Sequence, residues 1–157
     1  MPATLSLTKL LFFISTLFLL LALPAISAAV EPVYTGFRSQ YAIQGYDTVA
    51  YFTQNQAVRG DTEFQSEWQD TLWLFSSAKH KALFDANPEA YAPQYGGYCA
   101  YAMADGKAVR VDPTAFSVID DKLYLNFSRR IQSRWEADSS SFIERANPHW
   151  MTLLSGQ

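Results

Sequence analysis

The chain has 157 residues, enough for one ordinary domain, and its 12 basic and 15 acidic side chains give a formal net charge of −3. A mildly acidic chain without a basic run is a poor candidate for binding nucleic acid or an anionic membrane surface. Its one cysteine, Cys99, excludes an internal disulfide, and it also excludes iron–sulfur clusters and cysteine-rich zinc sites.

The first thirty residues are typical of a secretory signal peptide. Lys9 precedes an apolar run at 10–23, and Pro24 and several small residues follow that run. The run is shorter than the roughly 20 apolar residues that a spanning helix needs. We therefore expect a signal peptide over 1–28 and an exported protein, periplasmic or extracellular. The alternative is an uncleaved anchor, in which case this segment alone would contact the membrane.

The remaining residues, 29–157, are expected to form a single domain that begins with β-structure. The run "VAYF" at 49–52 is β-rich and follows the turn-like "GYD". The segment "EFQSEW" at 63–68 alternates polar and aromatic residues, and "TLWLF" at 71–75 follows after two residues. Two such runs so close together predict an antiparallel hairpin.

A helix is expected directly after this hairpin. Ser76 or Ser77 can act as the N-cap of "AKHKALFDA", and an Asn-Pro pair ends the pattern. His80 lies on the same helix face as the leucine and phenylalanine three and four positions further on. The spacing therefore predicts that His80 points inward.

In the second half of the chain, strands precede helices again. The segment "YCAYAM" at 98–103 is expected to be a strand, and "AFSVI" and "KLYLNF" are expected to be two more, joined by two aspartates. A helix follows from Ser128, and another begins near Ser139 and is interrupted at Pro148. These elements predict an α+β fold, a small twisted antiparallel sheet with helices packed on one side, and no sequence repeat is apparent.

Three blocks together, "AIQGYDTVAYF", "FSSAKHKALFDANPEAYAPQYGGYCAYA" and "DDKLYLNF", resemble the YHS domain family. More narrowly, they resemble its exported bacterial branch, in which one such domain follows a signal peptide. The similarity covers about residues 40 to 150. YHS domains are similar to the TRASH-type metal-binding modules, which carry three thiolates. At those three positions this sequence has Asp47, Ser76 and His80, which argues against tight binding of Cu(I), because Cu(I) prefers sulfur.

One hypothesis is a mononuclear metal site for zinc or copper, formed by Asp47, His80 and Cys99. These side chains suit a borderline divalent ion, and His80 is expected to face the sheet that carries Cys99. Each residue also has a structural interpretation. Cys99 can be a small buried apolar side chain, His80 a hydrogen-bonded core histidine and Asp47 a turn cap.

A second hypothesis is an aromatic pocket for a small molecule. Tyrosines cluster in two blocks expected to meet in space, with two glycines beside them. Aromatic walls with a few polar tips are typical of ligand pockets, although an aromatic core has the same composition. The candidate pocket residues are Tyr46, Tyr51, Tyr91, Tyr95, Tyr98 and Tyr101.

An enzyme has the least support. Cys99 and His80 could form a nucleophilic pair, but no orienting acid or familiar catalytic motif accompanies them. We therefore expect an exported YHS-type binding or accessory module and not an enzyme. It would bind a divalent metal through the residues named above. The alternative is a metal-free domain that uses an aromatic pocket to bind a small molecule or a protein partner.

Overall fold

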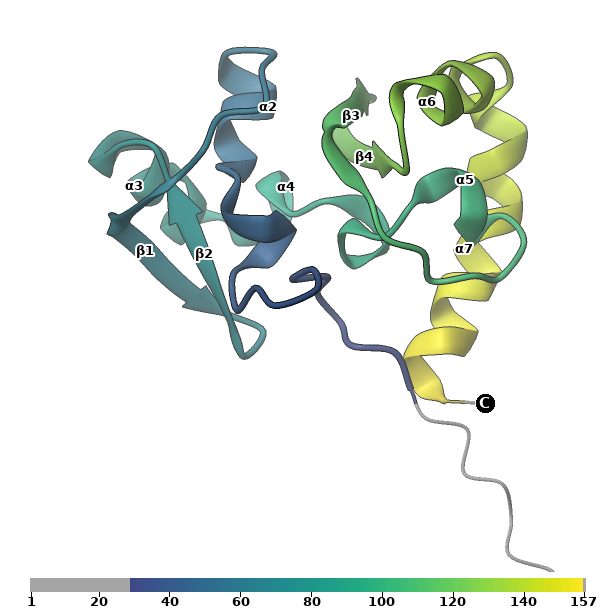
Figure 1. Ribbon diagram of the computed structural model, residues 1–157, viewed down its shortest axis with the longest axis horizontal. Coiled ribbons are helices and arrows are strands. Elements are labelled where there is room, and N and C mark those ends of the chain that lie inside the picture. Colours follow the sequence, from purple (N-terminus) through teal and green to yellow (C-terminus); the bar gives the residue numbers. More distant parts are fainter. Residues whose placement is uncertain (1–28, 157) are drawn as a thin grey trace, which may run out of the picture.

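The computed structural model describes residues 29–156, shown in Figure 1, so the expected signal peptide lies outside the described residues. The α+β fold class is confirmed. Within residues 29–156, no helix has both the length and the apolar character needed to cross a membrane.

The strands form two separate two-stranded sheets and not one continuous sheet. The first pairs β1 (Asp61–Trp68) with β2 (Thr71–Phe75), and the second pairs β3 (Asp112–Ile119) with β4 (Lys122–Asn126), both antiparallel. Figure 1 shows the hairpins in different halves of the molecule. Each is followed by a helix, α3 (Ala78–Ala86) after the first and α6 (Arg129–Glu136) after the second.

The two halves repeat one order of elements. Each begins with a 3₁₀ turn, η1 (Ala42–Gly45) or η2 (Gln94–Gly97), and continues with a short helix, a hairpin and a capped helix. The short helices are α2 (Thr48–Thr53) and α5 (Ala100–Met103). We call residues 41–86 the first unit and residues 93–136 the second unit.

Hydrogen bonds establish which positions of the two units correspond. The N–H of Asp47 donates to Val58 O (2.8 Å), and the N–H of Cys99 donates to Val109 O (3.0 Å). Asp47 and Cys99 therefore occupy equivalent positions, each just before the short helix. The strand register is irregular at the same place in both hairpins, next to the first residue of β1 and of β3.

The caps of the longer helices match as well. The hydroxyl of Ser77 accepts the N–H of His80 (3.2 Å), and the hydroxyl of Ser128 accepts the N–H of Ile131 (3.4 Å). Short identical segments stand at equivalent positions of the two units, including "GY" at 45–46 and 97–98 and "AVR" at 57–59 and 108–110. The expectation of no repeat is therefore wrong, because the matches are too short and scattered to be recognised before the backbone aligns them. A short helix, α4 (Pro88–Tyr91), connects the units.

Two expected strands are helical. Residues 49–52 lie in α2, where the Asp47 side chain accepts the N–H groups of Val49 and Ala50 as an N-cap. Residues 100–103 form α5, whose N-cap residue is Cys99. Both helices are too short for a 3.6-residue apolar period to be seen in the sequence.

The last helix, α7 (Ser139–Ser155), continues through Pro148, so the expected interruption is wrong. Proline removes one backbone donor from a helix, and this loss is tolerated when the helix is held on both sides. Ala146 before Pro148, and Trp150 and Leu153 after it, all pack in the same apolar cluster.

The core has two clusters that share β4. Leu123 and Leu125 face a cluster that contains Trp73 and Phe84 of the first unit. Tyr124, between them, faces the other cluster, which includes Trp135 and residues of α7. Alternate side chains of one strand thus join the two units.

Candidate functional site

Asp47 is the centre of a buried polar network in the first unit. Its carboxylate is fully buried, and Oδ1 accepts the N–H groups of Val49 (3.0 Å) and Ala50 (3.3 Å). The other oxygen, Oδ2, accepts the N–H (2.8 Å) and hydroxyl (2.5 Å) of Ser76 and lies 2.6 Å from His80 Nδ1. A carboxylate away from water is stable only when it is paired and hydrogen-bonded in this way.

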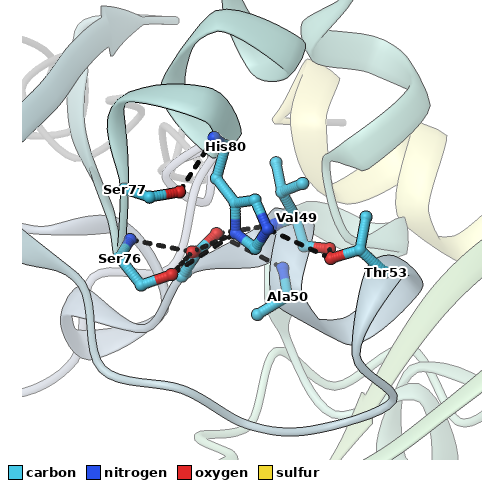
Figure 2. A network of polar contacts seen from close by, with 7 residues as sticks. Val49, Ala50, Thr53, Ser76, Ser77 and His80 are labelled. Atoms are coloured by element: carbon cyan, nitrogen blue, oxygen red, sulfur yellow. Dashed lines mark hydrogen bonds and ion pairs between the residues drawn. The ribbon is translucent and has the colours of Figure 1, made fainter.

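His80 completes the network from α3, and it points inward as the sequence predicts. The residue is 6% exposed, and its Nε2 lies 3.2 Å from Thr53 Oγ1. The hydroxyl of Thr53 also contacts Val49 O at 3.0 Å, as Figure 2 shows. Because the Thr53 hydroxyl has one proton, it can donate either to Val49 O or to His80 Nε2.

The three residues expected to bind a metal do not come together. Cys99 lies in the second unit, where its thiol donates to Asn126 Oδ1 at 3.8 Å. Within residues 29–156, no group of three or more His, Cys, Asp or Glu side chains could hold a metal ion. The structure does bring Asp47, Ser76 and His80 into contact, which are the positions that the resemblance aligns with thiolates.

The Asp47–His80 pair has the geometry of a direct hydrogen bond. Its O–N distance is 2.6 Å, whereas two ligands of a tetrahedral zinc ion with bonds of about 2.0–2.1 Å lie roughly 3.3 Å apart. Both carboxylate oxygens already accept hydrogen bonds from other groups. The residues as placed therefore do not fit a metal, and metal binding here stays a prediction.

Cys99 lies in an apolar environment that disfavours its thiolate. The residue is 1% exposed, and burial raises the pKa of the thiol, which backbone hydrogen bonds lower only in part. His80 contacts Asp47, Ser76 and Thr53 and does not pair with Cys99. The described residues therefore do not form the nucleophilic pair considered from the sequence.

The candidate tyrosines do not line one pocket. Tyr51 is buried in the core, where its hydroxyl donates to Pro113 O (2.9 Å) and burial raises its pKa. Four others each contact a different neighbour: Tyr46 lies under the Arg59 guanidinium, Tyr91 packs on Phe52, Tyr98 on Tyr34 and Trp150, and Tyr101 on Phe142. Among the six, only Tyr95 lines the larger cavity described next.

A cavity of 690 Å³ lies where the two units meet α7 and the segment before η1. The turn of the first hairpin, η2 and α7 all contribute residues to its wall. Its aromatic lining consists of Trp68, Trp73, Tyr95 and Trp150. Its polar lining consists of Gln69, Asp70, Gln94 and Asn147.

Contacts within the wall hold these aromatic rings in place. Trp73 Nε1 donates to Trp68 O (3.1 Å), and the two indoles meet edge to face at 5.7 Å. Across the cavity, Tyr95 and Trp150 meet edge to face at 6.5 Å, and the Tyr95 hydroxyl donates to Asn147 Oδ1 (3.1 Å). Because these contacts are internal to the protein, the cavity exists without a ligand.

One feature of the sequence indicates this site, and it is the high content of aromatic residues. The cavity residues come from four separate segments, and nothing in the local sequence predicts that these segments meet. Comparisons of the chain with protein-family models, with curated proteins and with solved structures find no match.

Proposed function

We propose that the chain is an exported YHS-type binding module whose ligand site is the aromatic cavity between its two units. The observation that carries this proposal is the cavity itself, 690 Å³ in volume and lined by three tryptophans and Tyr95. Small-molecule sites in proteins occupy roughly 300–1,000 Å³ and combine apolar walls with a few polar groups.

The lining chemistry supports binding and not catalysis. Among the residues that line the cavity, only Asp70 and Tyr95 can titrate, and none is a histidine, cysteine, serine or lysine. Burial raises the pKa of Tyr95, so its hydroxyl stays neutral and bonded to Asn147. The cavity therefore offers shape, aromatic surface and hydrogen bonds, without a paired nucleophile and base.

Tryptophan fluorescence provides a direct test, because three of the four tryptophans line the cavity. The purified protein is titrated with a panel of small aromatic and alkyl compounds that are neutral, cationic or anionic. We expect at least one compound to give a saturable fluorescence change and a matching rise in melting temperature. Trp150→Ala should abolish both responses, because Trp150 forms one wall.

The matched control is Trp135→Phe, since Trp135 is buried in the core and does not line the cavity. Its Nε1 has no hydrogen-bond partner among the described residues, so removing the donor leaves nothing unpaired. This variant should keep the full ligand response. A panel without any saturable binder, or equal responses from wild type and Trp150→Ala, would contradict the proposed site.

A further inference from the structure

The charge in the cavity has one sign. Asp70 is its only charged lining residue, and no lysine or arginine lines it. Among residues 29–156, the two ion pairs are Asp47–His80 and Lys81–Asp85, and neither involves Asp70. A carboxylate beside a mostly apolar wall favours a cationic ligand over an anionic one.

Asp70 is held at the cavity by the tight turn of the first hairpin. Gln69 and Asp70 form this turn with φ values of 51° and 55°, and the strands pair on both sides of it, Trp68 opposite Thr71. Asp70 is exposed at this turn, two residues from Trp68, and both residues line the cavity.

Of the aromatic residues of the cavity, Trp68 and Trp150 are partly exposed and can receive a cation, whereas Trp73 and Tyr95 are buried. Four arginine guanidinium groups lie over aromatic rings in the described part of the chain, at 4.2 to 5.0 Å from the ring centroids. Those rings belong to Phe37, Tyr46, Phe127 and Phe142, none of which lines the cavity. Tryptophan is the ring that binds organic cations best, and here no internal cation competes for it.

We propose that the cavity selects an organic cation, with its alkylated ammonium group against the tryptophans and near Asp70. This inference rests on the proposed function and adds the chemical class of the ligand. A quaternary or tertiary alkylammonium suits the site because its charge is spread over apolar methyl groups. Such a group needs aromatic faces and one nearby carboxylate, with few directed hydrogen bonds.

Three probes of the same shape and different charge test the selection. Choline is the cation, 3,3-dimethylbutan-1-ol is its uncharged carbon isostere, and 3,3-dimethylbutanoate is the anion. Each is titrated into the purified protein and followed by tryptophan fluorescence and calorimetry. We expect choline to bind about tenfold more tightly than the neutral isostere, with weaker binding still for the anion.

Asp70→Asn keeps the size of the side chain and removes its charge. This variant should weaken choline binding by about three- to tenfold and leave the neutral isostere unaffected. The control is Asp121→Asn, at the equivalent turn position of the second hairpin and outside the cavity. It should change neither affinity.

The outcomes separate this inference from the proposed function. Equal affinities for choline and its isostere would keep the binding site and overturn the cation selectivity. Binding of panel compounds other than choline, with no binding of choline itself, would likewise keep the binding site and overturn the cation selectivity. Failure of every compound would overturn both proposals. If the tryptophan fluorescence changes only when the protein self-associates, and with no compound, the cavity binds a second copy of the chain. That result would also overturn both proposals.

Discussion

The two units place different side chains on the same backbone, and the difference centres on the position just before the short helix. In the first unit this residue is Asp47, which pairs with a buried histidine. In the second unit it is Cys99, whose thiol contacts the side chain of Asn126 at 3.8 Å and has no charged partner. The corresponding pairs around this position are Asp47 and Cys99, Ser76 and Phe127, and His80 and Ile131.

The same unit therefore folds with or without a buried aspartate–histidine pair. Ile131 packs against the apolar cluster where His80 makes polar contacts in the first unit. The second unit has its own unpaired group, because Asn126 Nδ2 has no partner among the described residues. Replacing a buried ion pair with apolar side chains is often neutral or stabilising, whereas removing one partner is costly.

The largest expected effect is that of Asp47→Ala. This change leaves the imidazole of His80, the hydroxyl of Ser76 and three backbone N–H groups without their acceptor. We expect the free energy of unfolding to fall by about 3–5 kcal/mol in urea denaturation, a large part of the stability of a small domain. Cys99→Ala is the matched control and should cost only about 1–2 kcal/mol. Equal losses would contradict the asymmetry between the units.

The next largest effect is that His80→Ile should restore part of the stability that Asp47→Cys removes. The double variant gives the first unit two side chains of the second, and it removes both members of the hydrogen-bonded pair together. We expect it to be more stable than the sum of the single variants predicts, by about 1–3 kcal/mol in a double-mutant cycle. Strict additivity would show that the two side chains do not act as one pair.

The sequence predicts the elements whose signals are local. Each longer helix in the two units begins at a capping serine, Ser77 or Ser128, and both hairpins show strands joined by two-residue turns. The six-residue α2 and four-residue α5 carry no readable period. Asp47 caps α2 while contacting Ser76 and His80, and such distant contacts leave no local pattern. The passage of α7 through Pro148 likewise depends on tertiary packing.

The candidate sites show the same division between local and distant signals. The inward orientation of His80 follows from helix spacing, but its partner Asp47 lies 33 residues away in the sequence. The clusters of tyrosines do not predict the cavity, because three of its four aromatic lining residues are tryptophans, from β1, β2 and α7. Single-residue chemistry could thus be predicted from the sequence, whereas the meeting of the two units could not.

A smaller effect concerns the Cys99 thiol and pH. Burial raises the pKa of this acid in the folded protein above its value in the unfolded chain. Its contribution to stability is therefore fully present below the unfolded pKa and is lost as the pH rises through the folded pKa. We expect wild type to lose more stability than Cys99→Ala between neutral and alkaline pH, measured by thermal melts.

Wild type must be compared with Cys99→Ala because burial also raises the pKa of Tyr51. This second shift likewise lowers the stability of the folded protein at alkaline pH in both proteins. The native thiol should also react slowly with a disulfide reagent at neutral pH and quickly in urea. Fast reaction of the folded protein would mean that Cys99 is accessible, contrary to its burial.

The smallest effect lies in the two hairpin turns, which the units share. Asp70 and Asp121 are each the second residue of a two-residue hairpin turn, and both have positive φ, 55° and 56°. Glycine is favoured at this position. Asp121→Gly should raise the free energy of unfolding by about 0.5–1 kcal/mol, because glycine adopts this backbone conformation without steric cost. Asp70→Gly should stabilise the protein by a similar amount and also remove the preference for choline over its isostere. Equal choline selectivity in both glycine variants would show that the turn of the first unit serves only the fold.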